Sequence, residues 1–482
     1  MVFSSPIFLF CFLPVVLGLY FAAPRRARNA VLLLASVVFY AWGEKQVVLV
    51  LLASSAGNYL LARWVARARE QPSARRAVAI AVAGNLGLLV YFKYTNFLAD
   101  NLNVVLARCG LPGVMVSPVA LPAGISFFTF HALSYVIDVH RRDAEPQRAP
   151  IELALYMALF PQLIAGPILR YRDVARQLTE RVVTPEGFAL GVRRFIVGLA
   201  KKVLLADTLA VAADGVFGVP AGELGGALAW LGAVAYGLQL YFDFSGYSDM
   251  AIGLGRMFGF QFRENFDYPL VSRSVTEFWR RWNISLSTWF RDYLYIPLGG
   301  NRCAPWRVYA NLWTVFLLCG LWHGARWTFV VWGALHGALM VIERLGFGRV
   351  LERAPAALAH GYLLLAFTVT FVVFRADTLH HAAVVVAAMV GLGAPADAAR
   401  PVSLYWNPAF GLALAVSMVA ATPVTSWTRR RWRTLRARVA PRTPLADGAV
   451  AAGGVLVLGV LLLACVATLS ATTHHPFLYF RF

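Results

Sequence analysis

Long apolar runs recur from one end of the chain to the other, and they restrict its fold more than any other feature. A helix needs about 20 mostly apolar residues to cross a bilayer. Of the 482 residues, 59% are hydrophobic and only 14% are charged. In a typical soluble domain about 45–50% of the residues are apolar and about 25% are charged. We therefore predict an all-α polytopic membrane protein with roughly ten to twelve transmembrane helices. The clearest runs are 7–22, 47–61, 77–91, 362–374, 408–421 and 449–469.

The net charge of +20 is distributed in a way that favours a membrane protein over a nucleic-acid-binding protein. The Lys and Arg residues gather in short loops between the apolar runs, as the positive-inside rule describes for cytoplasmic loops. We expect the clearest of these loops to face the cytoplasm and both termini to lie outside. The loops are 25–28, 63–76, 140–148 and 429–442.

The sequence has no pattern of metal or cofactor ligands. Its five cysteines are scattered, with no CxxC pair and no metal-ligand spacing. A Walker-type phosphate loop, a GxSxG motif and an HExxH motif are all missing from the sequence. We therefore expect no metal site and no bound cofactor.

Three parts of the chain differ in texture, although no linker or repeat divides it. Residues 1–115 are plain hydrophobic segments with basic loops, and residues 346–482 return to plain spans. Residues 118–345 interrupt their apolar runs with polar, aromatic, Gly and Pro residues. Broken backbone at membrane depth is tolerated only where protein or a water-filled cavity covers it. We predict a single membrane domain, 1–482, whose chemistry lies in 118–345.

One histidine lies between two apolar segments of this middle part. His323 occurs in the sequence Gly-Leu-Trp-His-Gly-Ala-Arg-Trp, which begins at Gly320. An ionisable side chain within a membrane is costly and is a functional candidate by default. A neutral imidazole can also accept a proton near pH 7. His323 is therefore the main candidate for a catalytic base, and the alternative is a structural histidine that hydrogen-bonds a neighbouring helix.

A second histidine, His336, follows thirteen residues later (336 − 323). On one continuous helix, thirteen residues turn by roughly 220°, so the two imidazoles would face nearly opposite directions. If Gly324 ends the first helix, His336 belongs to the next one and can return toward His323. We expect His336 to support packing or the site, and its role stays open.

Asn283 lies in a dense aromatic and basic motif, Phe-Trp-Arg-Arg-Trp-Asn, that begins at Phe278. An amide can orient an imidazole or donate to a developing oxyanion, and it can equally pack between helices. The neighbouring Arg280 and Arg281 are either anchors at a helix end or ligands for a phosphate-bearing donor.

Two acidic residues, Asp243 and Asp249, lie within an apolar run. Six residues turn a helix by about 240° net, so the two carboxylates do not share a face. Acids at such a position should face a cavity or pair with Arg or Lys, and we expect Asp249 or Asp243 to pair with a neighbouring Arg. The nearby Lys201 and Lys202 are typical of lysines that extend to the membrane interface.

These motifs together resemble the membrane-bound O-acyltransferase (MBOAT) superfamily, specifically its bacterial alginate O-acetylase branch. The resemblance is essentially full length, and its most specific parts are the segments 278–301 and 321–329. The matching blocks are 121–141, 160–171, 198–207, 241–259, 278–300, 321–337, 371–376 and the terminal 476–482.

The resemblance implies a helical shell around a central tunnel, in the inner membrane of a bacterium. The family's active-site histidine falls on His323, and its second signature position falls on Asn283, where bacterial members often carry histidine. His323 would act as a general base, and Asn283 would orient the reactants or stabilise the oxyanion. His131 occupies a position where glutamine is expected, and we attach no function to that change.

The same resemblance implies the substrates and a partner. The donor would be acetyl-CoA or another acyl thioester from the cytoplasm. The acceptor would be a hydroxyl of an exopolysaccharide such as alginate. A periplasmic acetyltransferase of the SGNH type would complete the transfer.

Alternatives to this function remain open from the sequence. Within the superfamily, D-alanyl transfer to teichoic acid and peptidoglycan O-acyl transfer use the same framework. Outside it, a transporter or a structural membrane subunit would also have broken helices and polar residues near the midplane. No paired, inverted arrangement of the two halves is visible, which disfavours a transporter.

Overall fold

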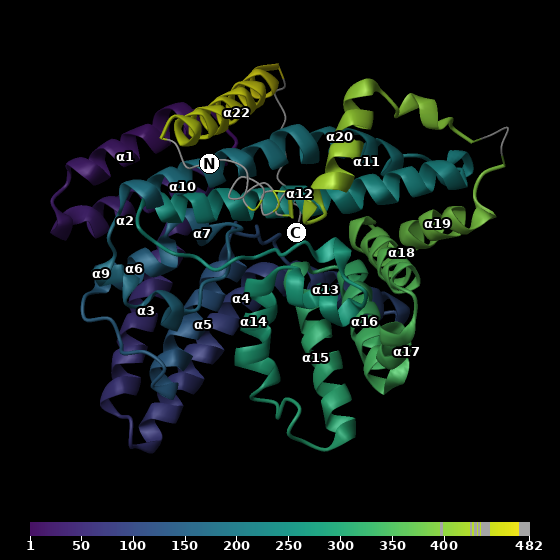
Figure 1. Ribbon diagram of the computed structural model, residues 1–482. Coiled ribbons are helices and arrows are strands. Elements are labelled where there is room, and N and C mark those ends of the chain that lie inside the picture. Colours follow the sequence, from purple (N-terminus) through teal and green to yellow (C-terminus); the bar gives the residue numbers. More distant parts are fainter. Residues whose placement is uncertain (396–398, 425–426, 429–430, 432–433, 435–443, 472–482) are drawn as a thin grey trace.

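The computed structural model describes residues 1–395, 399–424, 427–428, 431, 434 and 444–471. These parts consist of helices and loops without a β-strand, so the predicted all-α fold is confirmed (Figure 1). The α-helices are α1 (Leu13–Ala22), α2 (Arg28–Glu44), α3 (Val48–Arg67), α4 (Pro72–Arg108), α5 (Ile125–Arg141), α6 (Pro150–Ala158), α7 (Phe160–Leu163), α8 (Tyr171–Val174), α9 (Gln177–Glu180), α10 (Pro185–Ala200), α11 (Asp207–Phe217), α12 (Gly226–Met257), α13 (Val275–Arg281), α14 (Ile284–Phe290), α15 (Pro305–His323), α16 (Trp327–Ile342), α17 (Gly348–Arg353), α18 (Ala356–Arg375), α19 (Leu379–Ala387), α20 (Pro408–Ala420) and α22 (Pro444–Ala471). Short 3-10 or π segments are η1 (Phe8–Phe12), η2 (Arg25–Ala27), η3 (Lys45–Val47), η4 (Lys201–Ala206), η5 (Ala221–Glu223), η6 (Pro269–Val271), η7 (Arg291–Tyr295), η8 (Glu343–Phe347), η9 (Ala388–Leu392) and η10 (Val402–Leu404).

Several of these helices can cross a membrane by length and composition. Among the described residues five segments are long and apolar enough: Arg25–Arg67, Pro72–Arg108, Trp327–Arg353, Ala356–Arg375 and Val450–Ala471. Shorter apolar helices are Phe8–Ala22, Leu379–Leu392 and Pro408–Ala420. The chain is therefore a multi-pass membrane protein, while the larger number of ten to twelve spans stays a prediction.

A pair of long helices crosses the upper half of the molecule in Figure 1, below α22. Helix α12 packs along the continuous helix made by α10, η4 and α11. Gly198 faces Gly246 and Gly191 faces Gly253, and a Cβ at any of the four would lie 2.6–2.7 Å from the partner's carbonyl oxygen. Small residues allow membrane helices to approach this closely. The contact fixes α12, which bears many of the polar residues of the middle part.

The two acidic residues of α12 pair with bases, as predicted. Asp243 lies 2.9 Å from Lys202, and Asp249 lies 2.7 Å from both Arg194 and Lys201. Lys202 is buried, so the prediction that it extends to the interface is wrong. A buried carboxylate needs a partner charge beside it, and Lys202 supplies that charge to Asp243.

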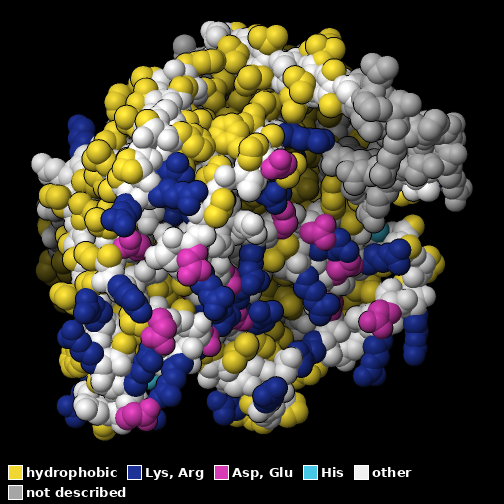
Figure 2. Space-filling model, turned by 60° about the vertical axis from the view of Figure 1, so that its left-hand side comes forward, with side chains coloured by type: hydrophobic (Ala, Val, Ile, Leu, Met, Phe, Trp, Pro, Cys, Tyr) yellow, Lys and Arg dark blue, Asp and Glu magenta, His cyan; other side chains and the backbone are white. Residues whose placement is uncertain are grey.

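Two loops that the sequence assigns to the cytoplasm lie side by side. The loops 63–76 and 140–148 are joined by an ion pair of 2.7 Å between Arg69 and Glu145. Figure 2 shows Lys, Arg, Asp and Glu side chains gathered over the middle and lower part of one face, below a mostly hydrophobic region. The two loops therefore share one side of the molecule, as the predicted topology requires.

Two sequence features cannot be placed in this way. The basic loop 429–442 lies outside the described residues except for Arg431 and Thr434. The terminal segment 476–482 also lies outside the described residues.

Candidate active site

The turn between α15 and α16 presents His323. Gly324 ends α15 with extended backbone, and α16 begins at Trp327. A Cβ at Gly324 would overlap the ring of Phe329, so only glycine allows this close return of the chain. His323 is consequently the last residue of α15, at the end of a tight helical hairpin.

The imidazole of His323 is held in one tautomer by its own helix. Its Nδ1 lies 2.7 Å from the carbonyl oxygen of Cys319. A carbonyl oxygen can only accept, so Nδ1 must carry the proton. In the neutral imidazole the lone pair then lies on Nε2. Nε2 is therefore the ring nitrogen that can accept a proton, as a general base does.

Aromatic rings surround this imidazole. The ring centroids of Trp322 and Trp332 both lie 4.9 Å from that of His323, and that of Phe374 lies 5.4 Å away. All three rings are edge-on to the imidazole. They leave little room for it to rotate, so the orientation set by Cys319 is maintained.

A cavity of about 240 Å³ opens beside the imidazole, and we call it the His323 cavity. Its walls come from the end of α2, from α4, from the start of α5 and from the end of α15. Typical small-molecule sites enclose about 300–1,000 Å³, so this cavity is smaller than most of them. The lining residues are Glu44, Lys93, Leu121, Pro122, Ala123, Gly124, Ile125, Ser126, Phe127, Ile164, Trp322 and His323.

An irregular segment before α5 forms one wall of this cavity. Gly124 has φ +77°, and a Cβ there would lie 2.5 Å from the carbonyl oxygen of Leu163, so glycine is required on both counts. The broken backbone at 121–124 thus lines the His323 cavity, and a cavity is one of the two settings in which such a break is tolerated at membrane depth. His131, further along α5, is fully buried against Tyr156. Neither of its ring nitrogens has a hydrogen-bond partner in the described part of the chain.

The break at Gly324 brings His336 back toward His323, which the sequence left open. The ring of Trp332 contacts both imidazoles, with centroid distances of 4.9 Å to His323 and 4.8 Å to His336. Trp279 Nε1 donates a hydrogen bond of 3.2 Å to His336 Nδ1. His336 is therefore held within the aromatic layer next to the site.

Asn283 adopts a left-handed backbone conformation, with φ +43° and ψ +54°, at the start of α14. Asn, Asp and His are the non-glycine residues that enter this region most readily. Asn283 is buried, but no hydrogen bond joins it to His323 among the described residues. Tilted and edge-on ring contacts of Trp282, Phe371 and Phe374 lead from the neighbour of Asn283 to His323. The two predicted site residues therefore share one aromatic core without touching through a hydrogen bond.

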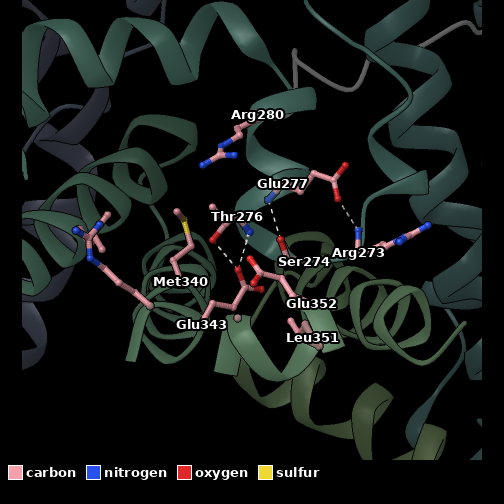
Figure 3. Close-up of a pocket in the computed structure, with 12 residues that line it drawn as sticks. Arg273, Ser274, Thr276, Glu277, Arg280, Met340, Glu343, Leu351 and Glu352 are labelled. Atoms are coloured by element: carbon pink, nitrogen blue, oxygen red, sulfur yellow. Dashed lines mark hydrogen bonds between the residues drawn. The ribbon is translucent and has the colours of Figure 1, made fainter. Parts of the chain in front are cut away.

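A second cavity, of about 550 Å³, lies near the other end of α16, and we call it the Arg280 cavity (Figure 3). Glu343 accepts hydrogen bonds from the backbone N–H and the hydroxyl of Thr276, at 2.9 and 2.6 Å, and so caps α13. Arg280 lines this cavity, whereas the neighbouring Arg281 forms an ion pair with Glu277 at 3.0 Å. The lining residues are Arg273, Ser274, Thr276, Glu277, Arg280, Leu312, Met340, Glu343, Arg344, Gly348, Leu351 and Glu352.

One row of side chains on α16 links the two cavities. Met340 lines the Arg280 cavity, and His336 and Trp332 follow it at successive four-residue steps, which places all three on one helix face. Trp332 in turn contacts His323. Buried side chains, including Trp279, fill the space between the cavities.

Ion pairs fix the turn η7, which precedes α15 and lies outside the candidate spans. The carboxylate of Asp292 pairs with Arg170, with Arg172 at 2.5 Å and with Arg291 at 2.8 Å. Burial raises the pKa of Asp292, but the hydrogen bond and charge of Arg291 and the charges of Arg170 and Arg172 outweigh it, so the pKa is lowered. Asp292 therefore stays ionised at neutral pH and ties η7 to the start of α8.

Sequence reasoning missed two residues of α4 that hold the end of α15. Lys93 Nζ contacts the carbonyl oxygens of Trp322 and His323, and the Tyr94 hydroxyl donates to the Leu321 carbonyl at 2.8 Å. A lysine directly after the apolar run 77–91, within one continuous helix, was the available signal. No group of three or more potential metal ligands occurs among the described residues.

A comparison with protein families matches residues 111–374 to the membrane-bound O-acyltransferase family. The chain belongs to this family. It is a multi-pass membrane O-acyltransferase, and the resemblance inferred from its motifs is confirmed. Both His323 and Asn283 lie inside the matched range. Membership of this family indicates an enzyme, and not the transporter or structural subunit that the sequence left open.

Curated relatives extend the match. A probable alginate O-acetylase, AlgI, of Pseudomonas putida is 45% identical over 495 residues, which cover 100% of each chain. A peptidoglycan O-acetyltransferase of Helicobacter pylori is 36% identical and covers 81% of this chain and 80% of its own. A teichoic acid D-alanyltransferase of Bacillus subtilis is 30% identical, over 45% of this chain and 57% of its own.

Proposed function

We propose that this protein moves an acetyl group from a cytoplasmic thioester donor toward hydroxyls of an extracellular or periplasmic polysaccharide, alginate or a similar exopolysaccharide. The relative that matches the whole chain is named a probable alginate O-acetylase, which supports both the acetyl group and the acceptor class. A cytoplasmic donor and an external acceptor require the bacterial inner membrane as the location.

The observation that carries the proposal is the state of His323. Its Nδ1–H donates to the Cys319 carbonyl, which leaves the lone pair on Nε2, and the residue lines a cavity. His323 acts as the general base and Asn283 as a supporting residue that orients the reactants or stabilises the oxyanion. Catalysis belongs to 118–345 within the single domain 1–482, and 346–482 supplies the C-terminal spans.

The chemistry balances without a metal or redox step. Nε2 of His323 takes the proton of the acceptor hydroxyl as its oxygen attacks the thioester carbonyl carbon. The new C–O bond forms, the C–S bond breaks, and the imidazolium returns the proton to the leaving thiolate. A general base of this kind contributes about 10²–10⁴ in rate.

The two cavities suit the two substrates. On the predicted topology, α4 starts at the basic loops and reaches Lys93 about 30 Å further on, so the His323 cavity opens toward the outside. The Arg280 cavity lies at the opposite end of α16, and its lining contains three arginines as well as three glutamates, namely Arg273, Arg280, Arg344, Glu277, Glu343 and Glu352. Guanidinium groups bind phosphates well, so this cavity suits a phosphate-bearing thioester such as acetyl-CoA. The aromatic row between the cavities must then move to admit the acyl group.

A second protein completes the transfer. The His323 cavity is too small to hold a polymer segment, with about 240 Å³. We infer a periplasmic acetyltransferase of the SGNH type that receives or presents the acyl group at this cavity, and this rests on resemblance to alginate-type systems.

Peptidoglycan is the second candidate acceptor, because the Helicobacter pylori relative named for it covers 81% of this chain. D-alanyl transfer has weaker support, since the match to the relative named for it covers only 45% of this chain. Mass spectrometry of surface polysaccharides and peptidoglycan, with and without the gene for this protein, identifies the polymer that loses its O-acetyl groups.

The direct test of the mechanism is His323→Ala. We expect acetylation to fall by at least about two orders of magnitude, as for a lost general base, while the amount of membrane-inserted protein stays the same. Transfer of radiolabelled acetyl from acetyl-CoA measures the effect. Near-normal activity of the folded variant would contradict the assignment of His323.

A further inference from the structure

The carbonyl groups at the end of α15 have an unusually complete set of partners. The last carbonyls of a helix lack intrahelical donors and must find others. The Cys319 carbonyl accepts from the His323 ring, and the Gly320 carbonyl accepts from the Gly324 N–H at 3.3 Å. The next three carbonyls, of residues 321–323, all depend on side chains of α4. The helix end that carries the candidate base is thus held from a distant part of the sequence.

Lys93 provides most of this support. Its Nζ contacts the carbonyl oxygens of Trp322 and His323, the latter at 3.3 Å, and the hydroxyl of Ser126 at 3.4 Å. The side chain is 9% exposed and forms no ion pair with a described acidic residue. The charged form of a buried lysine in a membrane is expensive, and such residues are functional by default.

The position of this ammonium goes beyond capping a helix. Lys93 lines the same cavity as His323, and Ser126 lines it too. A cation at a helix C-terminus is favourable for the helix dipole, but a neutral hydroxyl serves the neighbouring carbonyl equally well, as Tyr94 shows at 2.8 Å. The charge itself is therefore what distinguishes Lys93 from Tyr94.

We propose that Lys93 is a positioning residue for acyl transfer, whose ammonium fixes the backbone of His323 so that the imidazole keeps its place at the cavity wall. It also places a positive charge in the cavity where negative charge develops on the attacked carbonyl. This inference rests on the proposed function of His323. A displacement of about 1 Å at a reacting group can cost about 10²-fold in rate, which sets the scale of the effect.

The test compares variants at two adjacent positions in purified protein with radiolabelled acetyl-CoA, alginate oligosaccharides and the periplasmic partner. Lys93→Met removes the charge and keeps the length of the side chain. We expect kcat to fall about 10- to 100-fold while KM for acetyl-CoA changes less than about three-fold, because ground-state binding of the donor is untouched. Tyr94→Phe removes a hydrogen bond from the same helix end, and we expect a change below about three-fold.

Rescue by an added amine separates the charge from packing. Lys93→Ala leaves space in the wall of the His323 cavity, and we expect ethylammonium, but not ethanol, to restore activity with rising concentration. Lys93→Arg keeps a cation, and we expect it to retain more activity than Lys93→Met. Rates are normalised to folded protein measured by size-exclusion chromatography, so a variant with low yield is still informative.

Three results would overturn the inference. They are a wild-type kcat in folded Lys93→Met, equal losses in Lys93→Met and Tyr94→Phe, or equal rescue of Lys93→Ala by ethylammonium and ethanol. His323→Ala in the same assay tests the proposed function separately. An active His323→Ala variant would refute the role of His323 as the base, whereas the three results above would refute only the role of Lys93.

Discussion

At the scale of single residues, the backbone of Asn283 decides which side chains can occupy its position. A left-handed conformation favours Gly, Asn, Asp and His. This explains in physical terms why a signature position can carry Asn in one protein and His in another. It also means that the identity of Asn283 is no proof of a chemical role, because the turn alone selects for it.

Substitutions at Asn283 separate the turn from the chemistry. Asn283→Gly removes the amide without backbone strain, whereas Asn283→Ala adds about 1–2 kcal/mol for an L-residue in this region. If the amide supports catalysis, both variants lower the acetylation rate by about 10- to 10³-fold, in the range of a lost oxyanion donor. Asn283→His is expected to keep part of the activity. A wild-type rate in Asn283→Gly, measured with acetyl-CoA, would reduce Asn283 to a turn residue.

At the scale of helices, close packing of glycines explains how α10 and α12 approach each other. Gly198 and Gly246 leave no space for a Cβ, because each would lie within 2.7 Å of the other's carbonyl oxygen. In a bilayer, helix association depends on such van der Waals contact rather than on the hydrophobic effect. The pair also aligns the ion pairs of Asp243 and Asp249 with bases on the neighbouring helix.

Gly198→Ala tests this contact. The added methyl group must push the two helices apart, and overpacking of this kind costs about 1–3 kcal/mol. We expect the thermal midpoint of the detergent-purified protein, followed by size-exclusion chromatography after heating, to fall by several degrees. The control is Gly87→Ala on α4, whose Cβ would meet no atom within 4 Å. An equal midpoint for both variants would mean that the α10–α12 contact contributes little to stability.

At the scale of the whole molecule, the candidate site draws on all three parts of the chain. His323 and Asn283 come from 118–345, but Lys93 comes from 1–115 and Phe374 from 346–482. Helix α4 has 37 residues, which corresponds to about 55 Å at 1.5 Å per residue, more than a hydrocarbon core of about 30 Å. It is therefore long enough for its two ends to emerge on opposite sides of the membrane, as the predicted topology requires.

The topology predicted from the basic loops can be tested by cysteine labelling at the two ends of α4. In a protein whose exposed Cys11 and Cys109 are replaced by alanine, we expect Met115→Cys to react with a membrane-impermeant maleimide in intact cells. Met115 is 98% exposed. Gln71→Cys, at the other end of α4, should react only after the cells are opened. Labelling of Gln71→Cys from outside would invert the topology.

The sequence by itself determined the membrane class, the enzyme family and the identity of His323 as the main candidate. Each of these depends on local composition or on a contiguous motif, such as the apolar runs or the residues around Gly324. The pairing of Asp243 and Asp249 with bases was also predictable, because a buried carboxylate at membrane depth must find a cation.

Only the tertiary structure decided what surrounds His323. Lys93 is 230 residues away from it in the sequence. Its place after an apolar run marks this lysine but fits equally well a lysine that extends to the interface, as the wrong prediction for Lys202 illustrates. The tautomer of His323 and the return of His336 likewise depend on how α15 ends at Gly324. Hydrogen-bond partners of a helix end come from whichever element packs against it, and that packing is a property of the whole fold.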